Sequence, residues 1–273
     1  GKSESFFGEA LKGIERTDYV ISTKVGRIIE SDFSHNSDES LNSFVNIPNV
    51  QSVYDYSRDG ILKSLEDSLK RLNLEYVDMV LIHDADNHMY QALNETIPVL
   101  EELRSEGVVK AIGCGMNYVD PLIQFARHGD FDVFLLAGRY TLLDQSGFDV
   151  LMPLCLEKEI SIVLGGPYNS GLLASDLNDP CVRTKYFYED TPPEVLSKAR
   201  LIKDVCDRYS VPLKAAALQF GFGHPSVAST IPGARTLEEV TENFKMAEIL
   251  IPPELWIELV DQNLMPKNIP FPV

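Results

Sequence analysis

Six short apolar runs, each followed by an amphipathic segment, constrain the fold of this 273-residue chain more than any other feature of its sequence. The runs are rich in valine, isoleucine and leucine, which is typical of strands covered on both faces of a parallel sheet. Because a helix follows each strand, the strands are expected to pair in parallel. The predicted strands are residues 19–24, 77–82, 108–114, 133–137, 160–164 and 227–231.

This alternation predicts an α/β fold of the (β/α)8 TIM-barrel type. A closed barrel needs eight strands, whereas the pattern gives six and the sequence opens on a helical segment. We therefore expect a barrel without its first two strands, open between the strands at 19–24 and 227–231. The sequence has no internal repeat, linker or low-complexity tract, so residues 1–273 are expected to form a single, N-terminally truncated barrel domain.

Charged or titratable side chains end two neighbouring strands. Lys24 closes the first strand, and His83 closes the second and is followed by Asp84. In barrels of this type, side chains at the C-terminal ends of the strands surround the active site. Lysine at a turn, or a single histidine, more often has a structural role. At equivalent positions of adjacent strands, Lys24 and His83 together indicate a site.

The segments between strands carry further expectations. Residues 27–56 are polar and long for a connection, which predicts an irregular loop with a functional role. Ser57 is expected to cap the helix that follows. His224 is expected to be solvated, and Trp256 in the last helix to serve packing.

Composition excludes several classes of partner. A net charge of −17 argues against nucleic acid and anionic membranes, because both attract basic surfaces. The four cysteines are widely spaced, so we expect neither a metal site nor a disulfide framework. No apolar run approaches the ~20 residues of a membrane span, and the first residues lack a signal-peptide pattern. The expected location is the cytoplasm.

The order of several short motifs resembles that of the aldo-keto reductases. Residues 22–26, STKVG, resemble the family's lysine strand, and residues 81–83, LIH, resemble its histidine strand. Residues 231–233, IPG, with Glu242 and Asn243, resemble its adenosine-binding segment. The stretches DYSRDG, HDAD, AGRYTLLD and NSGLL are similar to the sugar-oxidising branch, which includes aldose 1-dehydrogenases and pyridoxal 4-dehydrogenase.

This resemblance implies an NAD(P)-dependent oxidoreductase that oxidises an aldose of the L-fucose or L-galactose type at C1 to the lactone. In that chemistry a lysine lowers the pKa of a catalytic tyrosine and a histidine orients the substrate oxygen. Lys24 and His83 match these catalytic roles. The family's tyrosine would stand three residues before Gly1, and its aspartate earlier, so residues 1–273 alone are expected to be nearly inactive. The alternatives are an NADPH-dependent reductase of small aldehydes and a non-catalytic protein of the same fold.

The resemblance also implies sites for a cofactor and a substrate, without a metal. Backbone N–H groups of residues 167–173 are expected to cradle the pyrophosphate. The cofactor is NAD or NADP, with a lean to NAD because Gly233 and Glu239 replace the lysine and arginine of many NADP-preferring members. The candidate cofactor residues are Asn117, Pro167, Ser170, Gly171, Gly233, Arg235, Thr236, Glu239, Glu242 and Asn243. The candidate substrate contacts are Tyr56, Asp84 and Arg139. The expected partner is a small sugar or aldehyde, and the expected state is a monomer or a weak homodimer.

Overall fold

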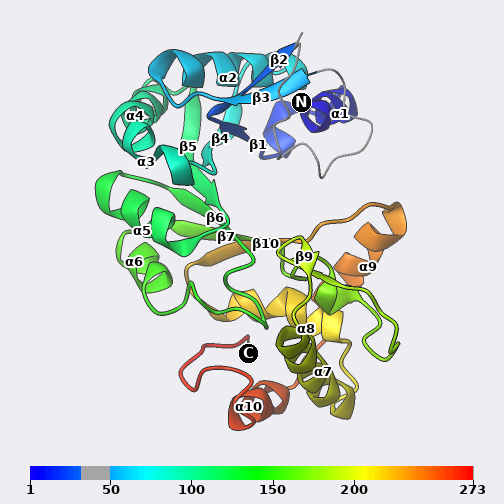
Figure 1. Ribbon diagram of the computed structural model, residues 1–273. Coiled ribbons are helices and arrows are strands. Elements are labelled where there is room, and N and C mark those ends of the chain that lie inside the picture. The colour runs from blue at the N-terminus through cyan, green and yellow to red at the C-terminus, as the bar shows by residue number, and fades with distance from the viewer. Residues whose placement is uncertain (32–49, 273) are drawn as a thin grey trace. The chain divides into compact units, whose positions relative to one another are not determined.

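The computed structural model describes residues 1–31 and 50–272. Within these ranges all six predicted strands are present and share one sheet, in the order β1-β4-β5-β6-β7-β10 (Figure 1). β1 and β10 stand at the two ends of that order, as predicted. The strands are β1 (Ser22–Val25), β4 (Val77–His83), β5 (Val109–Met116), β6 (Val133–Ala137), β7 (Ser161–Gly165) and β10 (Val227–Ile231).

The chain forms two compact units. The first contains Gly1–Met116 and Gln124–Phe134, and the second contains Asn117–Ile123 and Leu135–Val273. Both β6 and α5 (Val119–His128) begin in one unit and end in the other. That residues 1–273 make a single barrel domain stays a prediction.

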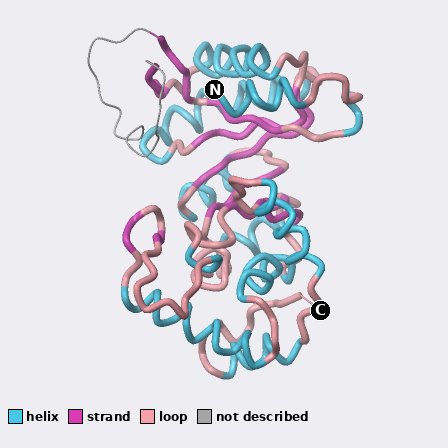
Figure 2. Tube along the Cα trace, turned by 90° about the vertical axis from the view of Figure 1, so that its right-hand side faces the viewer, coloured by secondary structure: helices cyan, strands magenta, loops and turns pink. Residues whose placement is uncertain are grey.

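In the first unit, β4 pairs in parallel with β1 and with β5. Its helices are α1 (Lys2–Ala10), α2 (Arg58–Leu72), α3 (Met89–Gln91) and α4 (Ile97–Ser105). The side chain of Ser57 accepts a hydrogen bond from the N–H of Gly60, which confirms the predicted cap of α2. α2 packs on β1 with Ile61 and Leu65 buried, so helices lie alongside the strands (Figure 2).

The segment at 27–56 corrects one expectation. Its two ends form an antiparallel ribbon of β2 (Arg27–Ser31) and β3 (Val50–Tyr54), with Arg27 opposite Tyr54. Ile28 is paired with Val53 across the ribbon, and such cross-strand contacts stabilise strands that are far apart in the sequence. Residues 32–49 lie outside the described part of the chain.

In the second unit, β10 pairs in parallel with β7. Its helices are α6 (Leu151–Glu157), α7 (Pro193–Arg208), α8 (Leu213–Gln219), α9 (Leu237–Glu248) and α10 (Pro253–Asp261), and a small hairpin joins β8 (Lys185–Tyr186) to β9 (Glu189–Asp190). Trp256 is fully buried, as predicted. The expectation of a solvated His224 was wrong, because this side chain is buried and its Nδ1 lies 2.8 Å from the Ser226 hydroxyl.

Candidate active site

Lys24 and His83 lie at the same end and on the same face of the sheet. In the β1–β4 register, Lys24 is opposite Leu81, two residues before His83. Residues opposite each other on paired strands share a face, and so do residues two apart along a strand. The other face of β1 carries buried Thr23 and Val25, which leaves Lys24 accessible. The structure thus brings together the two candidate catalytic residues.

An ion pair that the motifs did not reveal adjoins these two residues. Arg27, the first residue of β2, places its guanidinium 2.8 Å from the carboxylate of Asp84, and that carboxylate lies 3.3 Å from the imidazole Nε2 of His83. Asp84 has a left-handed backbone with a φ of 43°, which turns the chain sharply after β4. Its carboxylate belongs to an internal network rather than to an open loop.

The surroundings shift the pKa values of these groups. Burial, followed by the cations Arg27 and Lys24, lowers the pKa of His83 well below its usual range, so the imidazole is neutral at neutral pH. Nearby protein atoms lower the pKa of the Lys24 ammonium, with Asp84 opposing and Arg27 reinforcing the effect. Burial raises the pKa of Asp84. The group combines a neutral imidazole with two cations and a partly screened carboxylate.

Tyr56 has a different place from the one predicted. It was a candidate substrate contact, but its side chain is completely buried. Its hydroxyl lies 2.5 Å from the carbonyl oxygen of His83, to which it donates. It is not a substrate contact in this structure, because no surface of the ring is accessible. Its hydroxyl contacts the main chain at the C-terminal end of β4.

The candidate cofactor residues all belong to the second unit. The main chain of Asn117 is held by Arg139, whose Nε donates to the Asn117 carbonyl oxygen at 2.8 Å. The same guanidinium bonds to Asp144 at 3.0 Å and lies 3.7 Å from the centroid of the Phe187 ring. Arg139, predicted as a substrate contact, is thus largely occupied in holding the segment that carries Asn117.

The loop after β7 differs from the expected cradle, in which backbone N–H groups would be free to bind a pyrophosphate. The N–H groups of Asn169, Gly171, Leu172 and Leu173 all donate to carbonyl oxygens of residues 166–169. Pro167, one of the predicted cofactor residues, is buried and has no N–H. For these residues the expectation of free donors was wrong, because the loop is wound into consecutive turns.

Other features of this loop fit a nicotinamide dinucleotide. A side chain at Gly171 would meet no atom within 4 Å, and the same is true at Gly233. The buried Asn169 Oδ1 has no hydrogen-bond partner within the described ranges. Ser170 is exposed. Open space beside the main chain and an unused amide oxygen suit a ligand that carries phosphate and amide groups, whereas the Ser170 hydroxyl already accepts from the N–H of Tyr188 at 3.2 Å.

Candidate residues around α9 are connected by ion pairs and hydrogen bonds. Thr236 caps the helix through its hydroxyl, which accepts from the N–H of Glu239 at 3.2 Å. The carboxylate of Glu239 accepts from the Arg235 N–H at 2.7 Å and from its guanidinium at 3.0 Å. Arg235, the cation expected to reach a ribose phosphate, is therefore already paired.

Glu242 and Asn243 make separate contacts. The Glu242 carboxylate lies 2.5 Å from the ammonium of Lys214 in α8. Asn243 is buried, and its Oδ1 accepts from the Tyr168 hydroxyl at 2.8 Å. Asn243 therefore connects α9 to the loop after β7, a contact that brings two candidate cofactor segments together.

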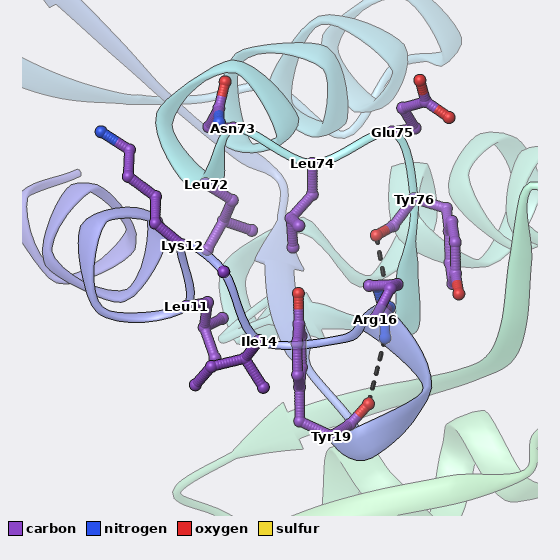
Figure 3. A pocket seen from close by; sticks show the side chains of 12 residues that line it. Leu11, Lys12, Ile14, Arg16, Tyr19, Leu72, Asn73, Leu74, Glu75 and Tyr76 are labelled. Carbon is purple, nitrogen blue, oxygen red and sulfur yellow. Dashed lines mark hydrogen bonds between the residues drawn. The ribbon is translucent and has the colours of Figure 1, made fainter.

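A cavity of about 450 Å³ lies in the first unit, and neither Lys24 nor His83 lines it. It is lined by residues that precede β1 and β4, so it lies at the N-terminal ends of these strands. Figure 3 shows Arg16 donating to the carbonyl oxygens of Tyr19 and Tyr76, whose rings flank its guanidinium. Active sites of barrel enzymes occupy the C-terminal ends, so this cavity is distinct from the candidate site.

Within residues 1–31 and 50–272, no group of three or more histidine, cysteine, aspartate or glutamate side chains is arranged to hold a metal ion. Among the helices of the same ranges, none is both long and apolar enough to cross a membrane.

Comparison with known proteins identifies the family. The model of the Aldo/keto reductase family matches residues 1–262. D-threo-aldose 1-dehydrogenase from a Pseudomonas species is 35% identical over 97% of this chain and 81% of its own, and pyridoxal 4-dehydrogenase from Microbacterium luteolum is 34% identical with the same coverage. The holo form of an aldo-keto reductase from Bacillus halodurans is 25% identical, covers 97% of this chain and 78% of its own, and has a TM-score of 0.71. The chain therefore belongs to the aldo/keto reductase family of NAD(P)-dependent oxidoreductases, which confirms the predicted resemblance, enzyme class and fold type.

Proposed function

We propose that this protein oxidises an aldose at C1 to the lactone, with Lys24 and His83 at the reacting centre. The observation that carries the proposal is the placement of these two side chains on one face and at one end of the β1–β4 pair. The names of two relatives, an aldose 1-dehydrogenase and a pyridoxal 4-dehydrogenase, support oxidation of a carbinol carbon. A bound NAD(P) supplies the hydride acceptor for such a reaction.

Lys24 contributes positive charge at the strand end. An ammonium close to an acidic hydroxyl favours its ionised form and lowers its pKa. Desolvation and the charge of Arg27 lower the pKa of the Lys24 ammonium, whereas the carboxylate of Asp84 opposes this shift. Lys24 would therefore assist removal of the proton from the substrate hydroxyl.

His83 contributes orientation rather than charge. Because its pKa is lowered, the imidazole stays neutral and offers one donor and one acceptor nitrogen. Such a ring can hold a substrate hydroxyl by a hydrogen bond without adding a charge. Asp84 and Arg27, which lie next to it, are polar groups suited to further hydroxyls of a sugar.

Residues of the second unit would hold the cofactor. We propose that Asn117 binds the nicotinamide carboxamide, Ser170 and Gly171 the pyrophosphate, and residues 233–243 the adenosine. The open main chain at Gly171 and Gly233 supports this assignment. The internal contacts of Glu242 and Asn243 would shape the adenosine site as well as line it.

A substrate panel tests the proposed reaction. The protein expressed from its complete reading frame would be assayed for NADH and NADPH formation with L-fucose, L-galactose and D-arabinose, and for reduction of small aldehydes. We expect aldose oxidation to have the higher kcat/KM. Aldehyde reduction with no aldose oxidation would replace the proposal by the reductase alternative.

Cofactor preference gives a second test, on which we propose a modest preference for NAD. Glu239 repels a 2′-phosphate and neutralises Arg235, whereas an arginine there would bind the phosphate. Glu239→Arg is expected to shift the ratio of dissociation constants toward NADP by about tenfold, the size of one charge-assisted hydrogen bond. Isothermal titration with NAD and NADP at matched salt measures the ratio.

Glu238→Arg is the matched control. Glu238 lies in the same first turn of α9, and its replacement by arginine changes the net charge by the same amount. It should shift the ratio much less. Equal shifts in the two variants would mean that long-range charge, not a contact at position 239, sets the preference.

A further inference from the structure

We propose that Tyr56 is a positioning residue, which ties the end of β4 to the turn after β1 and so fixes the His83 imidazole relative to Lys24. The inference rests on the proposed roles of Lys24 and His83, and Tyr56 itself touches neither substrate nor cofactor in it.

The hydroxyl of Tyr56 holds the end of β4. It lies 2.5 Å from the carbonyl oxygen of His83 and 3.2 Å from that of Asp84. Both carbonyls converge on it because Asp84 adopts a left-handed conformation. The Asp84 N–H donates to the Gly115 carbonyl oxygen at 3.1 Å, so the turn is fixed on two sides.

The ring of Tyr56 holds the turn after β1. It lies against Gly26, which has a φ of 100°. A Cβ at Gly26 would stand only 2.3 Å from the ring, so this close packing requires glycine. One side chain therefore contacts both the residue two positions after Lys24 and the main chain of His83 itself.

Tyr56 is held by contacts on several sides, so it can fix the ends of β1 and β4 relative to each other. Its side chain is completely buried, and its own carbonyl oxygen accepts from the buried Thr96 hydroxyl at 2.7 Å. The ring packs on His88 with centroids 5.1 Å apart. Burial raises the pKa of Tyr56 above its ordinary value, so the hydroxyl keeps the proton that it donates.

Tyr56→Phe tests the proposal, because it removes the hydroxyl and keeps the ring. In NMR spectra of the 273-residue chain, the Asp84 amide should exchange with solvent on the order of tenfold faster, the equivalent of one lost hydrogen bond. The His83 pKa should move upward toward its ordinary value. Amides in the middle of β4 should be unaffected, which separates local release from global destabilisation.

Tyr140→Phe is the matched control, because Tyr140 is also buried and its hydroxyl has no hydrogen-bond partner within the described ranges. It should change neither the Asp84 exchange rate nor the His83 pKa. Unchanged values in Tyr56→Phe, or equal changes in the two variants, would overturn the proposal.

A measurement on the unaltered chain covers the case in which the variant does not fold. The Tyr56 hydroxyl proton should exchange slowly enough to be observed and should show a nuclear Overhauser effect to the Asp84 amide. A rapidly exchanging hydroxyl would contradict the proposal. Failure of the proposed function would be seen differently, as full turnover in a Lys24→Met variant whose His83 and Asp84 signals are unchanged.

Discussion

Lys24→Met is expected to lower kcat for aldose oxidation by about 10²–10⁴-fold, the range for loss of assistance to proton transfer. Methionine matches the length of the lysine stem, and Lys24 is on the accessible face of β1, so the strand should be preserved. What disappears is the positive charge that favours the ionised form of a nearby hydroxyl. The measurement is steady-state turnover with saturating aldose and cofactor, by the protein expressed from its complete reading frame.

Lys70→Met provides the control for this prediction. Lys70 is exposed on α2 and pairs with Glu66 across one helical turn, so its loss removes the same charge from a remote surface. Its kcat should stay within about twofold, because an exposed pair contributes little. A Lys24→Met enzyme that kept kcat in the same range would exclude Lys24 from the reacting centre.

Asp78→Asn is expected to lower the free energy of unfolding by about 3 kcal/mol, since a buried charged acceptor loses its charge while its donors remain. Asp78 follows the first residue of β4 and is almost fully buried. Its carboxylate accepts from the Ile21 N–H at 2.9 Å, from Arg16 at 2.6 Å and from Lys110 at 2.7 Å. An asparagine amide turns an NH₂ group toward one of these donors and leaves it unpaired.

The same carboxylate predicts a specific pH dependence. The bonds from Lys110, Ile21 and Arg16 outweigh the cost of burial and lower the pKa of Asp78 to about 2, against about 3.9 in an unfolded chain. The folded pKa is the lower one, so this contribution is complete above about pH 4. It is lost as the pH falls toward 2 and amounts to about 3 kcal/mol.

Urea unfolding at a series of pH values measures both effects. Asp190→Asn is the control, because Asp190 is fully exposed in the β8–β9 hairpin. The loss caused by Asp78→Asn should shrink between about pH 4 and pH 2, whereas Asp190→Asn should be nearly neutral throughout. An Asp78→Asn loss below about 0.5 kcal/mol at pH 7 would show that burial cancels the three bonds.

Local sequence patterns were sufficient to predict the six strands of the parallel sheet. The predicted strands at 133–137 and 227–231 have the same limits as β6 and β10, because each is a short, largely apolar run flanked by polar or turn-forming residues. The positions of Lys24 and His83 near strand ends also followed from the apolar runs at 19–24 and 77–82. The β1–β4 register then placed the two on one face, which only the pairing itself could determine.

Long-range contacts account for what the sequence did not reveal. Tyr56 was predicted as a substrate contact, yet its hydroxyl is bound to the carbonyl groups of His83 and Asp84 in the interior. His224 is buried for a similar reason, because its ring packs against those of Tyr140 and Phe148, with centroids 5.9 and 6.1 Å away. The Arg27–Asp84 pair joins residues 57 positions apart, and no local periodicity reports such a contact.

The contacts of the candidate cofactor residues were likewise predictable from the sequence only in part. Glu239 and Arg235 are four residues apart at the start of a helix, a spacing that favours an ion pair, and the structure contains it. The inward-facing N–H groups of the loop after β7 depend on backbone angles that composition does not specify.

Transfer of deuterium from the sugar to the cofactor tests whether C1 is the hydride donor. L-Fucose labelled with deuterium at C1 would be incubated with NAD and the protein expressed from its complete reading frame, and the products examined by mass spectrometry and NMR. We expect one deuterium at C4 of the reduced nicotinamide, unlabelled lactone, and loss of both products in Lys24→Met. Reduced cofactor without deuterium, or label retained in an oxidised sugar, would show that C1 is not the hydride donor and would contradict the proposed reaction.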